Sequence, residues 1–431
     1  MHAKVIQFAE RPFIRNVMML GSGSAAAQLI TLLLSPFITR LYGPEAYGMM
    51  GVFISFTFII IPVAAMTYPE AMILANNSNE ASGLARISMI CSLAVASGIG
   101  LLLFLFNKEV ISLFNLQGIG NLLYLIPVIV IFSAYLEIIE SWLVRTKQFG
   151  VKAKVEVVQA SLLQGSRLGI GSFYPLSLIL IISWSLGIAG KAFLLSSFSS
   201  NEKKLKFSWN LNQGTSLKKI AISYKDFPLL RAPQTILYGI SEGLPVLLLA
   251  GLFGPASAGF YSIGRTVLSM PTNLITRSVG SVLYSKFVET ATNHGDLKKI
   301  LLKSTLALAA IGAFPFGIIC LFGPEIFVLV FGPEWLMAGE YSRWIAIWVF
   351  FLLISNPSRE LMPVLSYQGF HLKFTILSLI TGICSLGLGA YIFASEIAAL
   401  AIFGISAGIL NLMFIIITVF LCKNFKFQER V

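Results

Sequence analysis

Four ionisable residues lie well inside long apolar stretches of the chain, where a charge is costly. Arg167, Lys191 and Arg265 are cations, and Glu242 is a carboxylic acid. A charged side chain at the centre of a bilayer costs at least ~2.5–3.5 kcal/mol, so each is a functional hypothesis by default. Cations that face a cavity suit phosphate or acidic sugars, because they form charge-assisted hydrogen bonds. A carboxyl group in the same setting can bind a proton.

The depth of each residue along its expected helix separates these hypotheses. Glu242 lies about 13 residues from a helix end, roughly 20 Å at 1.5 Å per residue. Gly243 and Pro245 follow it and allow a helix break there. Proton coupling at Glu242 and a salt bridge to Arg265 or another lumen cation both stay open. Lys191 has the alternative of extending its ammonium group to the interface.

Other charged and aromatic side chains in the spans have a structural interpretation. Glu137 and Glu140 lie three residues apart on one helix face. We expect them to pair with Arg145 or Lys147 near the end of that span. Trp348 is expected to be an interfacial anchor, as tryptophans in membrane helices usually are.

No pattern in the sequence indicates an enzyme. There is no GxxxxGK[ST] phosphate loop, and neither a carboxylate pair nor a Ser/His/Asp set occurs in a water-accessible segment. Four single cysteines and three scattered histidines make no metal-ligand spacing, so we expect no cofactor, metal or disulfide. These residues are Cys91, Cys320, Cys384, Cys422, His2, His294 and His371.

The elements that must position the four charges are membrane helices. Of 431 residues, 56% are hydrophobic and only 12% are charged, about half the charged share of a soluble domain. We expect an all-α polytopic membrane protein with about twelve spans of roughly 20 residues. Their ranges are 17–39, 46–67, 84–106, 121–144, 155–172, 174–198, 229–253, 258–278, 301–323, 341–363, 372–394 and 397–421.

The distribution of lysine and arginine predicts the topology. Most basic residues fall in the two tails and the even-numbered loops, whereas the other side keeps Arg40, Lys108 and Arg343. By the positive-inside rule both termini are cytoplasmic. The net charge of +12 then reports membrane orientation, and we expect no nucleic-acid partner.

The chain also repeats itself. The segment 41–48 recurs as 252–259, and 84–86 matches 297–299, each time at an offset close to half the length. The repeat predicts two parallel six-helix lobes around a central cavity, at 1–198 and 229–431, joined by a cytoplasmic linker at 199–228. Six residues are expected to form structural turns in the first match: Gly43, Pro44, Gly48, Gly254, Pro255 and Gly259.

These segments resemble a known family. The stretch 16–51 looks like the first hairpin of bacterial polysaccharide-repeat flippases of the Wzx type, within the multidrug/oligosaccharidyl-lipid/polysaccharide exporter superfamily. Further segments resemble later parts of the same family. The matching residues are Gly21 to Ser24, Pro36 to Gly48, Tyr68 to Ala71, Leu84 to Arg86, Phe331 to Trp335 with Ala338, and Gln368-Gly369.

The resemblance implies a function. Such flippases move undecaprenyl-pyrophosphate-linked oligosaccharides across the bacterial inner membrane by alternating access, for O-antigen, capsule or other surface polysaccharide. Their lumen cations are thought to receive pyrophosphate or acidic sugars, which is the substrate-binding role expected for Arg167, Lys191 and Arg265. No family motif includes Arg167, Arg265 or Glu242, so their roles rest on depth. Membrane lipids, and a polysaccharide polymerase with chain-length proteins, are the expected partners.

Two alternatives stay open. A cation-coupled multidrug exporter of the same superfamily would share the fold. A membrane glycan polymerase is less favoured, because it calls for a large external loop with arginines, and the external side here has only three basic residues.

Overall fold

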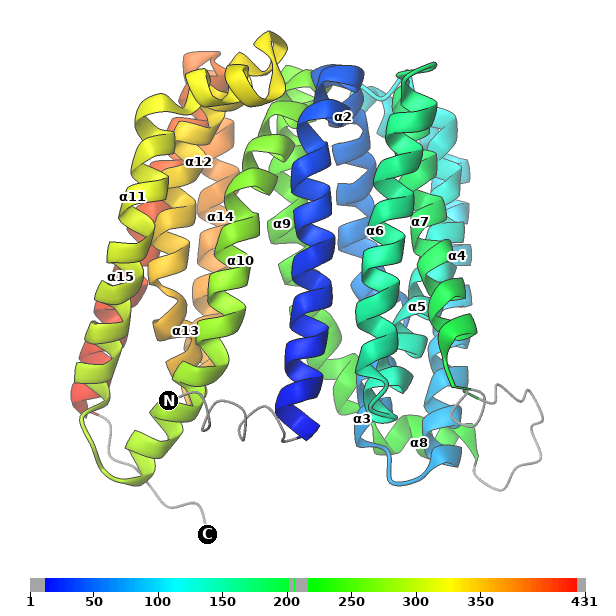
Figure 1. The fold of residues 1–431 in the computed structure, drawn as a ribbon, viewed down its shortest axis with the longest axis vertical. Coiled ribbons are helices and arrows are strands. Elements are labelled where there is room, and N and C mark those ends of the chain that lie inside the picture. Colours follow the sequence, from blue (N-terminus) through cyan, green and yellow to red (C-terminus); the bar gives the residue numbers. More distant parts are fainter. Residues whose placement is uncertain (1–11, 201–204, 206–215, 425–431) are drawn as a thin grey trace. The chain divides into compact units, whose positions relative to one another are not determined.

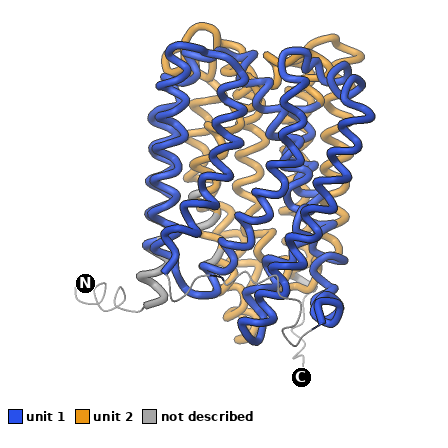
Figure 2. Tube along the Cα trace, turned by 90° about the vertical axis from the view of Figure 1, so that its right-hand side faces the viewer, with its two compact units in different colours: residues 1–247 blue, residues 248–431 orange. Residues whose placement is uncertain are grey.

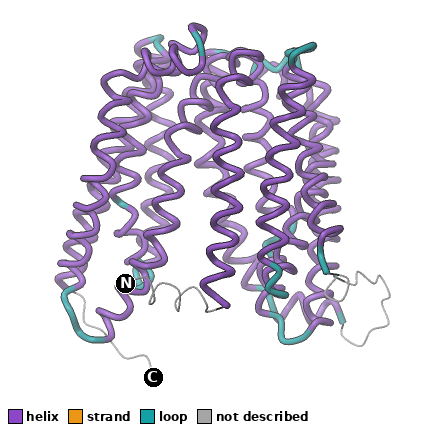
Figure 3. The backbone as a smooth tube through the Cα atoms, in the orientation of Figure 1, coloured by secondary structure: helices purple, strands orange, loops and turns teal. Residues whose placement is uncertain are grey.

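A computed structural model describes residues 12–200, 205 and 216–424 of the chain. Within these ranges every regular element is a helix (Figure 3). The all-α membrane fold expected from the sequence is confirmed.

The chain divides into two compact units, coloured separately in Figure 2. Unit 1 comprises residues 1–247 and unit 2 residues 248–431. Unit 1 contains α2 (Pro12–Ala64), α3 (Tyr68–Leu74), α4 (Ser78–Leu113), η1 (Gly120–Leu125), α5 (Ile126–Arg145), α6 (Phe149–Gly171), α7 (Ser177–Phe198), α8 (Leu217–Ser223), η3 (Phe227–Arg231) and most of α9 (Ala232–Phe253). Unit 2 contains α10 (Pro255–Thr292), α11 (Leu297–Phe331), η4 (Pro333–Trp335), α12 (Leu336–Ile354), α13 (Asn356–Leu361), α14 (Gln368–Phe393) and α15 (Glu396–Asn424).

Nine helical stretches within the described ranges are long and apolar enough to cross a membrane. All twelve expected spans overlap helices, but two of them lie in the single long helix α2, which has a break at Gly43. Neither α6 nor α10 is among the nine. The count of twelve therefore stays a prediction.

Backbone breaks recur at matching positions in the two units. Gly43 interrupts α2 with φ 70° and ψ 172°, and Gly254 precedes α10 with φ 98° and ψ 170°. Single non-helical residues kink α4 at Phe106 (φ −120°, ψ 20°) and α11 at Phe322 (φ −120°, ψ 21°). Both kinks fall in a Leu-Phe-x-x-Glu sequence. The repeat seen in the sequence thus extends to backbone conformation.

The starts of α4 and α11 also match. The side chain of Asn77 accepts a hydrogen bond from the backbone N–H of Glu80, and that of Asp296 accepts one from Lys299. Each is an N-cap that satisfies one of the free N–H groups of the first turn. The two caps show that Ser78 of α4 corresponds to Leu297 of α11. The sequence match of 84–86 with 297–299 instead aligns a later turn of α4 with the start of α11.

Small residues allow the helices of unit 1 to approach closely. A Cβ added at Gly23 of α2 would overlap the backbone of Ala153 in α6. Near the other end of α6, a Cβ at Gly171 would overlap the ring of Tyr42. Side chains larger than glycine would separate α2 from α6, the helix that carries Arg167.

The helix α9 packs on the second half of α2 in the same way. A Cβ at Gly239 would overlap the carbonyl oxygen of Phe58, and one at Gly243 would lie 3.0 Å from that of Ser55. The helix continues through Pro245 from Ala232 to Phe253. The break that Gly243 and Pro245 allowed is therefore not formed.

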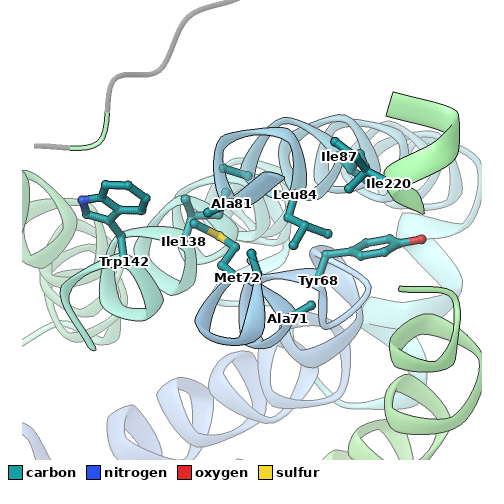
Figure 4. Close-up of a cluster of buried hydrophobic side chains, with 11 residues drawn as sticks. Tyr68, Ala71, Met72, Ala81, Leu84, Ile87, Ile138, Trp142 and Ile220 are labelled. Carbon is teal, nitrogen blue, oxygen red and sulfur yellow. The ribbon is translucent and has the colours of Figure 1, made fainter. Parts of the chain in front are cut away.

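One end of unit 1 has its own apolar cluster, drawn in Figure 4. Tyr68 and Met72 of α3 pack with Leu84 of α4, Ile138 of α5 and Ile220 of α8. Ile220 comes from the expected linker 199–228, of which 201–204 and 206–215 lie outside the described residues. The described end of that segment is thus packed against the unit.

Unit 2 has an aromatic core at the start of α12. Trp335, Tyr341 and Tyr261 are almost completely buried. The ring of Phe260 meets Trp335 and Tyr341 edge-on, with centroids 6.2 and 5.8 Å apart, a favoured aromatic geometry. This packing holds α10, which carries Arg265, against α12.

Candidate functional site

Arg167 is buried between three helices of unit 1, with 8% of its surface exposed. Its Nε donates to Ser183 Oγ of α7 at 3.2 Å, and a terminal nitrogen lies 3.6 Å from the sulfur of Met50 in α2. Its backbone carbonyl accepts a hydrogen bond from Tyr42 Oη at 2.8 Å. Within the described ranges no carboxylate pairs with Arg167. The guanidinium keeps donor capacity that neutral neighbours do not fill.

A second polar group lies one turn before Arg167 on α6. Gln164 is 4% exposed, and its Oε1 has no hydrogen-bond partner in the described part of the chain. Gln28 Oε1, on α2, is buried and without a partner in the same sense. Buried polar atoms usually have partners, so these two oxygens are acceptors that the described part of the chain leaves unused.

Lys191 belongs to an ion-pair cluster that joins three helices. Its Nζ lies 2.8 Å from Glu140 Oε1 of α5, and Lys152 Nζ of α6 lies 3.0 Å from Glu140 Oε2. The side chains of the two lysines are 21% and 13% exposed, and that of Glu140 is 28% exposed. Two cations share one carboxylate, which leaves the cluster with one net positive charge.

This cluster corrects the pairing expected for Glu140. Arg145 instead donates to the carbonyls of Met72, Ile73 and Ala75, at 2.9, 3.4 and 2.6 Å. These carbonyls end α3, where a cation complements the helix dipole and the free C=O groups. Arg145 is therefore a helix cap. Lys191 is held inside the protein by Glu140.

Glu242 lies near the middle of α9 and is partly buried. The next residue, Gly243, is in close contact with α2, which fixes this part of α9 in unit 1. Lys191, Arg167 and Glu242 are thus all in unit 1, whereas Arg265 is in unit 2.

Arg265 of α10 is stacked on an aromatic ring. Its guanidinium carbon lies 4.1 Å from the ring centroid of Trp348 in α12. Nε donates to Ser269 Oγ at 2.9 Å, and a terminal nitrogen lies 3.5 Å from Tyr261 Oη. Stacking on tryptophan, together with hydrogen bonds from the side of the group, holds the guanidinium in one plane.

Two features of this arrangement were missed at the sequence level. Trp348 was expected to be an interfacial anchor, but it is the stacking partner of Arg265. In the same unit, Arg359 donates to Asn411 Oδ1 at 2.7 Å, and Ser355 donates to the same oxygen at 3.0 Å. An asparagine in the middle of an apolar helix was the available signal, since such residues hydrogen-bond between membrane helices.

The described residues include no group of three or more histidine, cysteine or acidic side chains that could hold a metal ion.

Outside the spans, burial and the neighbouring carboxylate of Glu80 raise the pKa of Tyr224. Its phenol therefore stays neutral and lies 3.4 Å from Glu80 Oε2.

The sequence of the chain is similar to a protein family and to one characterised relative. The model of a family described as "Polysaccharide biosynthesis protein" matches residues 37–340. The succinoglycan biosynthesis transport protein ExoT of Rhizobium meliloti (strain 1021) is 21% identical over 322 residues, which cover 74% of this chain. The alignment spans only 61% of that relative's length.

Solved structures share the fold. An inward-facing multidrug resistance MATE family transporter of the MOP superfamily is similar with a TM-score of 0.72 and 12% identity, over 93% of this chain and 96% of its own. The lipid II flippase MurJ, in an inward closed conformation, is similar with a TM-score of 0.71 and 12% identity, over 93% and 87%. The fold of the chain is that of these membrane transporters.

Proposed function

The chain belongs to the polysaccharide biosynthesis protein family, and from that membership we propose that it is a flippase for lipid-linked oligosaccharides. In this proposal it moves undecaprenyl-pyrophosphate-linked repeat units across the bacterial cytoplasmic membrane by alternating access. The products serve O-antigen or another surface polysaccharide. In this proposal it is a transport protein and not an enzyme. The name of the relative ExoT and the fold shared with MurJ support transport of a polysaccharide precursor.

The observation that carries the proposal is the pair of arginine sites inside the helical units. Arg265 is oriented by Trp348, Ser269 and Tyr261, and Arg167 is held by neutral neighbours. A doubly charged pyrophosphate is bound most strongly by cations that the protein holds in a fixed orientation. Both arginines are proposed to bind the pyrophosphate or acidic sugars during translocation.

Further elements of the proposal come from the sequence. The two six-helix lobes are placed at 1–198 and 229–431, with the linker 199–228 and both termini on the cytoplasmic side, in accord with the distribution of basic residues. Glu242 is the proposed site of ion coupling. A polysaccharide polymerase and chain-length proteins are the proposed partners.

The test is the accumulation of lipid-linked repeat units in a host deleted for this gene. Wild type should release repeat units trapped on the cytoplasmic leaflet, and Arg265→Ala should leave them trapped at equal protein level. Arg343→Ala is the matched control in the same unit, because it also removes an arginine, one that pairs with Glu340 at 3.1 Å and has no proposed role in substrate binding. Full release by Arg265→Ala would assign Arg265 a structural role.

The same strain separates the alternative functions. Single repeat units exported without being lengthened would point to a polymerase. The shared fold with a multidrug transporter makes drug export the second candidate. Protection of cells against cationic drugs, without any change in lipid-linked glycans, would favour it.

A further inference from the structure

A groove runs between α6 and α7 of unit 1, the two neighbouring helices at the right of Figure 1. Its volume is about 370 Å³, at the small end of the ~300–1,000 Å³ typical of ligand sites. Leu162, Ile170 and Leu186 line it, and 62%, 50% and 65% of their surfaces are exposed. Its walls are mainly apolar and open to the surroundings of the unit.

The groove is elongated along the helices. On α7 its lining extends from Ile179 to Leu194, a rise of roughly 22 Å at 1.5 Å per residue. This length is most of the ~30 Å apolar thickness of a bilayer. The lining includes Gly190, at which an added Cβ would meet no atom within 4 Å. Such an extended and apolar space suits a hydrocarbon chain laid along the helices.

The two ends of the groove differ in charge. Lys191 lines it near the end where α7 finishes, and the ion-pair cluster of Lys191, Glu140 and Lys152 lies there with one net positive charge. Lys154, on the same turn of α6 as Lys152, adds another cation, and its ammonium group lies 4.7 Å from the ring centroid of Phe198. The opposite end, at Ile170 and Ile179, is apolar. An anionic head with a single apolar tail matches this polarity.

We propose that the groove between α6 and α7 binds the chain of a polyprenyl phosphate, with its phosphate beside Lys191. The inference rests on the proposed function, since it names the site for the lipid part of that substrate. In the predicted topology the basic end faces the cytoplasm, where a lipid-linked precursor is assembled. A membrane phospholipid has two chains and fits the single groove less well.

The test measures binding of a radiolabelled long-chain polyprenyl phosphate to the purified full-length protein in detergent. Gly190→Leu places a side chain in the groove without a backbone clash, and leucine is a better helix former than glycine. Gly165→Leu is the matched control, because Gly165 is on α6, also has nothing within 4 Å of an added Cβ, and does not line the groove. We expect Gly190→Leu to weaken binding about tenfold or more, equivalent to ~1.4 kcal/mol, and Gly165→Leu to leave it unchanged.

Three results would overturn the proposal. The first is wild-type affinity in Gly190→Leu. The second is equal competition by phosphatidylglycerol, which would make the groove a phospholipid site. The third is an equal effect of Lys191→Gln on binding of the polyprenyl phosphate and of the uncharged polyprenol. The proposed position of the phosphate predicts a larger loss of affinity for the polyprenyl phosphate. Unchanged elution and thermal unfolding of Gly190→Leu verify that the variant is folded.

The groove and the proposed function fail separately. If the chain does not release trapped repeat units in cells but Gly190→Leu still weakens polyprenyl phosphate binding, the groove stands as a lipid site and the transport proposal falls. If repeat units are released normally and Gly190→Leu binds the lipid like wild type, transport stands and the groove assignment is wrong.

Discussion

Substitution of Gly254 by alanine tests the backbone break that separates α9 from α10. Gly254 has φ 98° and ψ 170°, a region that is essentially open only to glycine and costs other residues ~1–3 kcal/mol. An added Cβ would meet no atom within 4 Å, so steric overlap contributes nothing further. Gly254→Ala should therefore lower the free energy of unfolding by about 1–3 kcal/mol through backbone strain alone.

The matched control is Gly98→Ala. Gly98 also has open space around an added Cβ, but it lies within the helix α4, where alanine is favoured over glycine by ~0.5–1 kcal/mol. The two variants should differ by about 1.5–4 kcal/mol in opposite directions. Reversible unfolding in mixed detergent micelles measures both. A Gly254→Ala protein as stable as wild type would refute the argument from positive φ.

Three further substitutions probe contacts inside unit 1. Glu140→Gln should lose about 1–3 kcal/mol of stability, because it leaves two lysines without their carboxylate. Adding Lys191→Gln should restore part of the loss, and strict additivity of the unfolding free energies would contradict the ion pair. Arg145→Gln should speed hydrogen exchange of the amides in α3, since the carbonyls at its end lose their donor; unchanged exchange would exclude the capping role. Tyr42→Phe should cost about 1 kcal/mol, as its hydroxyl donates to a backbone carbonyl of α6 at 2.8 Å, and a neutral effect on thermal unfolding would show that the bond contributes nothing.

Much of the fold is predictable from hydropathy. The spans expected at 372–394 and 397–421 correspond to α14 (Gln368–Phe393) and α15 (Glu396–Asn424) within a few residues, because continuous apolar stretches have one stable form in a bilayer. The span at 155–172 had a weak signal, since Gln159, Gln164 and Arg167 reduce its hydropathy. Packing against α2 through Gly23 stabilises the helix there, and hydropathy does not register such contacts.

Side-chain partners were less predictable. We expected Glu140 to pair with Arg145 or Lys147. Its partners are Lys152 and Lys191, which lie 12 and 51 residues further along the chain. Which of several nearby cations an acid meets depends on how α5, α6 and α7 are rotated about their axes. Trp348 shows the same limit, because its role follows from the orientation of α10 relative to α12.

The kinks at Phe106 and Phe322 have a mechanical consequence. A helix that is already interrupted at one residue bends there more easily than along a continuous hydrogen-bonded stretch. Each unit thus has a compliant point at the equivalent place in α4 and in α11. Each kink redirects the short segment beyond it, residues 107–113 or 323–331, relative to the longer part of its helix. The two units thus share the same bend at equivalent places.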